Sequence, residues 1–140
     1  MSASEIAKGL TLWPADRPDY PMGATVHYQA SDPYAIRLAF VQGSRETRSW
    51  TFGRELLAEG LSCRAGEGDV TVAPHEDVDD YLTLTFTPAP EDGGYPIALY
   101  AKREAVERLV DEVYGLVPVG REHRHIDVDA VIDRILAEVA

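Results

Sequence analysis

The densest group of side chains that could bind a metal or move protons is the segment Glu122–His125, which reads EHRH. If the segment is extended, His123 and His125 point the same way, as metal ligands would, and Asp127 could add an oxygen. A zinc site needs at least three well-placed protein ligands, and the other two histidines lie on distant segments. The structural interpretation is therefore preferred: these side chains pair with helix ends and carboxylates, and fix the link between two C-terminal helices. A metal or enzyme centre on the two histidines is the alternative.

A second candidate is the acidic run from His75 to Asp80, which could suggest a calcium-binding loop. With Asp77 as the first position, the EF-hand pattern requires glycine at the sixth position and glutamate at the twelfth. The sequence has Leu82 and Pro88 there. The run is therefore predicted to be a solvated turn between two strands.

No other motif points to a reaction. Gly66 and Gly68 lack the third glycine of a dinucleotide-binding motif and precede a strand, so they indicate a turn. Cys63 is the only cysteine, which fits a reducing compartment, and it is predicted to be a half-buried apolar side chain rather than a nucleophile. An acid–base pair assembled only by the fold stays open. The sequence assigns no catalytic, cofactor-binding or metal-binding residue, and it does not identify a partner-binding surface.

The composition favours protein partners over polyanions. The 140 residues fit one domain, residues 1–140, and carry a formal net charge of -11. Nucleic-acid binding needs a basic face that displaces counterions from phosphates, and anionic membranes are disfavoured for the same reason. The sequence shows neither a secretory signal nor an apolar run long enough for membrane insertion. We therefore expect a cytoplasmic protein.

The elements that would position these residues begin with strands. Alternating apolar residues predict strands over 5–13, 24–29, 34–41 and 48–52, with tight turns at 31–33 and 42–45. Further strands are predicted around Val70 and Val72, from Tyr81 to Phe86, and from Tyr95 to Leu99. The aromatic residues on these strands are predicted to pack in the core, or at a subunit contact as a second possibility: Tyr34, Phe40, Trp50 and Phe52.

Helices are predicted after each group of strands. Residues 54–59 form a short helix, with Gly60 placed as a left-handed cap. Apolar residues at helical spacing from Val106 to Val117 predict a second helix that Pro118 ends, and Asp127 is the predicted N-cap of a third. This order predicts an α+β fold of about seven antiparallel strands and three helices, arranged as two sheet units that are each followed by helix.

Four separated motifs make the sequence resemble a known family. They are Asp32–Ala35, Trp50–Gly60, Gly66–Val70 and Glu122–Asp127. Their order, spacing and residue identities resemble those of the SsgA-like family of actinobacterial sporulation and cell-division regulators, in particular its SsgB-like branch. The resemblance extends from about Pro21 to the C-terminus.

The resemblance implies a fold like that of the Whirly and mitochondrial guide-RNA-binding proteins, assembled as a homotrimer. It implies a non-enzymatic role in sporulation-specific septation, in which the protein is recruited to the septum and helps to position the tubulin-like division protein FtsZ. SsgA-like paralogues are further implied partners. The alternative function is a single-stranded nucleic-acid-binding module retained from the Whirly-like fold, although the acidity argues against it because fold alone does not fix function.

Overall fold

Seven antiparallel strands form one curled sheet in the order β4-β3-β2-β1-β7-β6-β5. The computed structural model describes residues 4–66 and 68–125. The strands are β1 (Glu5–Pro14), β2 (Met22–Gln29), β3 (Ala35–Gln42), β4 (Arg45–Gly53), β5 (Val70–Pro74), β6 (Tyr81–Phe86) and β7 (Ile97–Lys102). The helices are α1 (Arg54–Glu59) and α2 (Arg103–Leu116), and single 3-10 turns lie at Pro90–Asp92 and Glu122–His125.

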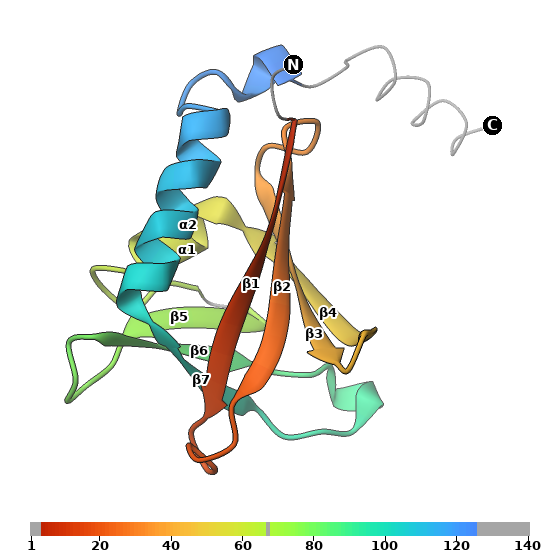
Figure 1. Ribbon diagram of the computed structural model, residues 1–140, viewed down its shortest axis with the longest axis vertical. Helices are drawn as coiled ribbons and strands as arrows, with labels where there is room; N and C mark the ends of the chain where they lie inside the picture. Colours follow the sequence, from red (N-terminus) through yellow and green to blue (C-terminus); the bar gives the residue numbers. More distant parts are fainter. Residues whose placement is uncertain (1–3, 67, 126–140) are drawn as a thin grey trace.

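The predicted order of two strand groups, each followed by a helix, is confirmed. The two groups do not form separate sheets, because β1 pairs with β2 on one side and with β7 on the other. Residue pairs such as Leu12 with Ala101 and Trp13 with Tyr100 provide this junction. In Figure 1, β1 and β2 run steeply while β5 and β6 run nearly horizontally at the height of their lower half, so the sheet turns sharply between its two strand groups.

The inner face of the curled sheet holds the core. Apolar side chains alternate inward along every strand, as the period-2 pattern predicted. Phe86 of β6 contacts Phe40 of β3 and Trp50 of β4, with ring centres 5.6 and 5.4 Å apart. These strands are not neighbours in the sheet, so the aromatic contacts hold its two halves together across the core.

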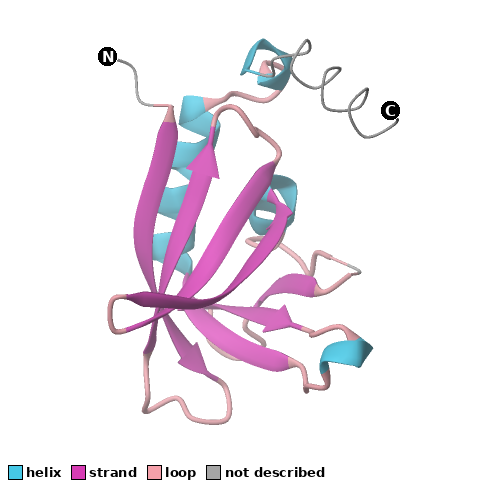
Figure 2. Cartoon of the chain, turned by 90° about the vertical axis from the view of Figure 1, so that its right-hand side faces the viewer, coloured by secondary structure: helices cyan, strands magenta, loops and turns pink. Residues whose placement is uncertain are grey.

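The helices cover the rest of this inner face. α2 packs on β1 and β7, and α1 packs on β5 and on α2 (Figures 1 and 2). Val106, Leu109 and Val113 of α2 are buried, as its helical spacing predicted. Neither helix has the length and apolar composition to span a membrane, within residues 4–66 and 68–125. The third predicted helix, from Asp127, lies outside the described residues.

Tyr34 does not pack in the core, and the last strand does not begin at Tyr95. Tyr34 is 52 % exposed because it belongs to the turn before β3, where its carbonyl accepts a hydrogen bond from the Arg54 N–H. Tyr95 is 89 % exposed, and β7 begins two residues later at Ile97. The residue between them is Pro96, which has no N–H to donate to a neighbouring strand.

The predicted left-handed cap at Gly60 was also wrong. Gly60 has φ -62° and ψ -15°, a right-handed conformation. A Cβ added there would overlap the side chain of Val72 on β5. Glycine is therefore required at this position by the close approach of α1 to the sheet and not by the turn.

Candidate functional site

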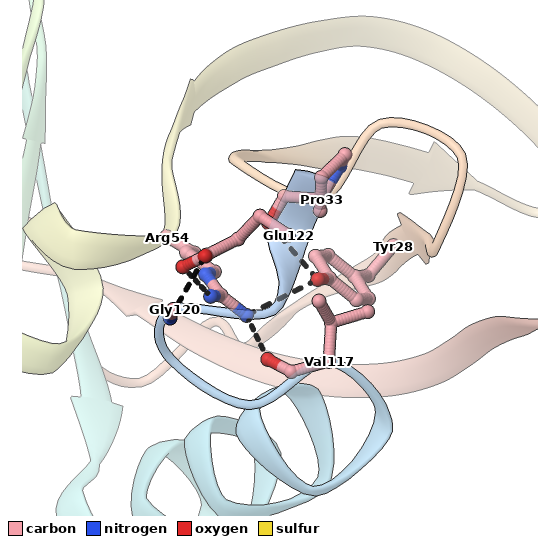
Figure 3. Close-up of polar contacts among 6 residues, drawn as sticks. All are labelled: Tyr28, Pro33, Arg54, Val117, Gly120 and Glu122. Carbon is pink, nitrogen blue, oxygen red and sulfur yellow. Dashed lines mark hydrogen bonds and ion pairs between the residues drawn. The ribbon is translucent and has the colours of Figure 1, made fainter. Parts of the chain in front are cut away.

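Arg54, the first residue of α1, is the one charged side chain that is buried among the described residues, with 2 % exposure. Its position follows from the chain path, since β4 leads directly into α1 and directs this residue inward. Nη1 donates hydrogen bonds to the Tyr28 hydroxyl (3.2 Å) and to the Val117 carbonyl (2.6 Å). Nη2 donates to Oε1 of Glu122 at 2.7 Å, as Figure 3 shows.

A second ring of contacts surrounds this guanidinium. The Tyr28 hydroxyl donates to the Pro33 carbonyl at 2.9 Å, and the Gly120 N–H donates to Oε2 of Glu122 at 2.9 Å. The Arg54 guanidinium carbon lies 4.2 Å from the centre of the Tyr114 ring, a cation–π distance. The Arg54 centre, defined by Arg54, Tyr28, Tyr114, Val117 and Glu122, therefore ties β2 and α1 to the end of α2 and the following turn.

The electrostatics of the Arg54 centre favour a fixed ion pair. Burial raises the pKa values of Tyr28 and Tyr114, although Arg54 opposes the shift in both. The pKa of Glu122 is lowered, first by its own backbone N–H and then by the hydrogen bond from Arg54. At neutral pH the two tyrosines are therefore protonated and Glu122 is ionised. No group here is set to exchange a proton, so the centre acts as a structural clamp.

The predicted polar segment Glu122–His125 contributes to this clamp through its glutamate. His123 is exposed on the 3-10 turn, and the side chains of Arg124, His125 and Asp127 lie outside the description. Within the described residues, no group of three His, Cys, Asp or Glu side chains is placed to bind a metal ion. Of the pairings that were predicted to hold this segment in place, the structure shows one, that of Glu122 with Arg54.

The two other histidines lie apart, on different elements. His27 Nε2 is 3.4 Å from Oε1 of Glu46, but the geometry is not that of a hydrogen bond and the atom is otherwise unpaired. Glu46 is held instead by Arg37 at 3.1 Å, and that hydrogen bond lowers its pKa. His75 opens the acidic turn, where its Nδ1 accepts hydrogen bonds from the N–H groups of Asp77 and Val78. The predicted solvated turn between strands is confirmed by its exposed carboxylates.

The prediction for Cys63 was wrong, because this residue is exposed. It lies in the turn after α1, and its N–H donates to the Glu59 carbonyl. The turn directs the side chain outward, where its Sγ lies 3.8 Å from the same carbonyl oxygen.

Arg54 was missed by the sequence analysis, which treated it only as the start of a helix. Its hydrogen-bonding partners lie 26, 63 and 68 residues away along the chain. A pattern of neighbouring residues does not encode contacts over such separations, so the sequence offered no signal for this centre.

A hollow of about 590 Å³ lies on the outer face of the sheet, over β5, β6 and β7. Small outward side chains form its floor, and the acidic turn after β5 contributes Glu76 and Asp77 to its rim. The Arg54 centre is closed by its own contacts, whereas this hollow lies open on the outer face of the sheet.

Comparison with known proteins places the chain in a family. Residues 22–122 match the model of the family described as Streptomyces sporulation and cell division protein, SsgA. The chain is 38 % identical to the sporulation-specific cell division protein SsgB of Kineococcus radiotolerans, over 95 % of this chain and 79 % of that protein. It is also 38 % identical to SsgB of Streptomyces coelicolor, over 84 % of each chain.

Two solved structures agree with this. The crystal structure of an SsgA-like sporulation-specific cell division protein from Thermobifida fusca superposes with a TM-score of 0.77 at 34 % identity, covering 96 % of this chain and 98 % of that one. A structure of SsgB, from work on mutations that correlate with longitudinal cell division during sporulation of Streptomyces coelicolor, gives a TM-score of 0.76 at 32 % identity, covering 88 % and 96 %. The chain belongs to the SsgA family of sporulation and cell division proteins.

Proposed function

We propose that this protein is a non-enzymatic adaptor that promotes sporulation septation by helping to position FtsZ. The observation that carries the proposal is the similarity to SsgB, which extends over 95 % of the chain. Because the match includes both strand groups and both helices, the whole folded unit is shared rather than one motif. A role in sporulation cell division follows from the family, and the contact with FtsZ is the proposed mechanism.

The charge supports a protein partner. A net charge of -11 repels polyanions and favours partners with exposed basic groups. We expect the adaptor to be a cytoplasmic homotrimer that is recruited to the septum through FtsZ and through SsgA-like paralogues. We propose that the protein has no catalytic site, since the Arg54 centre is a closed ion pair with no proton to exchange.

The direct test is co-sedimentation with polymerised FtsZ. The expected result is that the protein pellets with FtsZ filaments in a saturable way and stays in the supernatant without them. An acidic protein of similar mass from outside the family is the matched control for trapping. Absence of association at about 100 μM, a concentration that detects weak contacts, would remove FtsZ as the partner.

The same protein should be titrated with single-stranded DNA and RNA at low salt. We expect no binding. Salt-sensitive binding, the signature of phosphate contacts, would instead support the nucleic-acid-binding alternative.

A further inference from the structure

The outer face of β5, β6 and β7 carries a groove in two connected parts. The broad part, of about 590 Å³, has a floor of small side chains: Thr71, Ala73, Thr83, Thr85 and Ala98. The narrow part, of about 290 Å³, is lined by Trp13, Pro18, Val78 and Tyr81. His75 and Tyr100 line both parts, so the two adjoin at these rings on the same face of the sheet. We call the whole the outer-face groove.

The walls of the narrow part are aromatic and held in place. Trp13 and Tyr81 meet edge to face, with ring centres 6.0 Å apart at 84°. His75 and Tyr100 pack with ring centres 4.8 Å apart. Strand pairing sets Trp13 beside Tyr100, and two backbone N–H groups fix the His75 ring. A pocket formed in advance loses little side-chain freedom on binding, which lowers the cost of association.

The shape and chemistry of the groove suit an extended peptide. Aromatic-lined grooves bind proline-rich segments, whose polyproline II conformation is already extended and loses little entropy. The narrow part offers aromatic rings to a proline ring. The broad part has only small side chains on its floor, which leaves room for a main chain to continue across the strands.

The charge at the rim of the groove determines whether a basic or an acidic occupant is favoured. Glu76 and Asp77 line the groove, and Asp79 and Asp80 follow in the same exposed turn. None of these carboxylates takes part in an ion pair with a described residue. Arg64 is the one basic residue lining either part, and Lys102 approaches the Trp13 ring at 5.7 Å. The lining itself carries two carboxylates against one guanidinium, and this excess favours a basic peptide over the phosphates of a nucleic acid whose bases could stack on the same rings.

We propose that the outer-face groove binds an extended, proline-containing and basic segment of a partner protein. The inference rests on the proposed adaptor function and adds the chemical class of one partner. The proline ring occupies the narrow part, and the basic residues face Glu76 and Asp77.

The test uses the full-length chain and a synthetic decapeptide with the repeat proline–proline–arginine. Trp13 and Trp50 are the two tryptophans of the chain, so their indole N–H signals in a proton–nitrogen NMR spectrum report separately on the groove and on the core. We expect saturable shifts of the Trp13 signal and none of the Trp50 signal. Raising the NaCl concentration is expected to weaken binding, because exposed charges are screened.

A matched pair of surface variants provides the control. Val78 is 42 % exposed at the mouth of the narrow part, and Val119 is 75 % exposed in the turn after α2, outside the groove. Val78→Arg is expected to weaken the peptide about tenfold or more, since it adds bulk and a like charge at the site. Val119→Arg is expected to bind as the parent does. Equal loss in both variants would overturn the proposal.

Two further probes distinguish the basic peptide from an acidic peptide and from a nucleic acid. A decapeptide of proline–proline–glutamate is expected to leave the Trp13 signal unmoved, and equal binding of the two peptides would overturn the charge argument. A ten-nucleotide oligothymidine that shifts Trp13 while the basic peptide does not, or no shift up to about 2 mM peptide, would overturn the proposal. The titration contains no FtsZ, so a failure of the groove is distinguished from a failure of the FtsZ contact.

Discussion

At the scale of single residues, Arg54 makes the side-chain hydrogen bonds that span the longest stretches of sequence among the described residues. It is buried, and its partners come from β2, from the end of α2 and from the turn that follows. Removing one member of a buried ion pair leaves the other without its partner, which costs more than the pair itself contributes. The Arg54 centre is therefore expected to fix the position of the chain after α2.

The first prediction concerns Arg54→Met, which keeps an apolar chain of similar length and removes the charge. We expect it to lower the free energy of unfolding by about 3 kcal/mol or more, because Glu122 and the Val117 carbonyl lose their donor. Urea unfolding at fixed protein concentration measures this. Arg108→Met, which removes an exposed pair with Glu104, should change stability by less than about 1 kcal/mol.

The double variant Arg54→Met with Glu122→Leu completes the test. Replacing both members of a buried pair with apolar groups is often close to neutral, so the double variant should be more stable than Arg54→Met alone. If the two losses simply add, the residues act independently and the clamp interpretation is wrong.

The pH dependence of stability gives the second prediction. The pKa of Glu122 is lower in the folded protein than its ordinary value of about 4.3. The unfolded chain therefore takes up the proton first as the pH falls. The stability that the carboxylate contributes is present above about pH 4.3 and is lost as the pH falls through the folded pKa.

We accordingly expect Glu122→Gln to be less stable than the parent at pH 7, with the gap narrowing towards pH 3. Unfolding curves across this range measure the gap. The lowered pKa of Glu46 acts equally in both proteins and cancels from the difference. Glu104→Gln, at an exposed pair, should show almost no gap at any pH. A gap for Glu122→Gln that persists undiminished at pH 3 would show that packing, and not the charge, is responsible.

At the scale of elements, the close approach of α1 to β5 determines which residue can follow the helix. The helix ends at Gly60, whose backbone lies against Val72 of β5. Gly60 is buried, and its N–H donates to the Leu56 carbonyl. The helix and the second strand group approach each other more closely than any side chain at this position would allow.

The third prediction compares two glycine-to-alanine changes. Gly60→Ala should destabilise the fold by about 1–3 kcal/mol, because the added methyl group overlaps Val72 and forces the helix away. Gly115→Ala, at the exposed penultimate position of α2 with no atom near the new Cβ, should stabilise it by about 0.5–1 kcal/mol. Thermal and urea unfolding measure both. A neutral Gly60→Ala would show that α1 can shift freely on β5.

At the scale of the whole molecule, the two sheet edges are the places where assembly would begin. The edges are β4 and β5, and an unpaired edge can add another strand. A partner for β5 is already present in part, since Ala65 bridges to Val72. β4 begins with five exposed residues, Arg45 to Ser49, of which three are charged, and charged side chains at an edge oppose uncontrolled pairing.

The fourth prediction is the mass in solution. A homotrimer has a mass of about 46 kDa, three times the 15.4 kDa of one chain. Light scattering coupled to size-exclusion chromatography should give this mass over a tenfold range of concentration. A mass equal to one chain throughout that range would contradict the trimer.

The sequence by itself determined the elements of this protein. Period-2 alternation located the strands and their inward faces, and helical spacing located α2, because both signals arise between residues a few positions apart. The four motifs also indicated the family. The error at Gly60 arose because a distant residue, Val72 of β5, decides that position. Tyr34 and Tyr95 were errors at the beginning of a strand, where a turn and Pro96 delay the first strand residue.

Only the tertiary structure decided how the elements combine. The pairing of β1 with β7 joins two strand groups into one sheet, and the Arg54 centre joins residues up to 68 positions apart. The outer-face groove likewise needs Trp13, His75 and Tyr100 together. Such contacts depend on how strands twist and align, which a one-dimensional pattern does not encode. The sequence therefore determined an acidic α+β protein of the SsgA family, and the fold decided which face is hollowed.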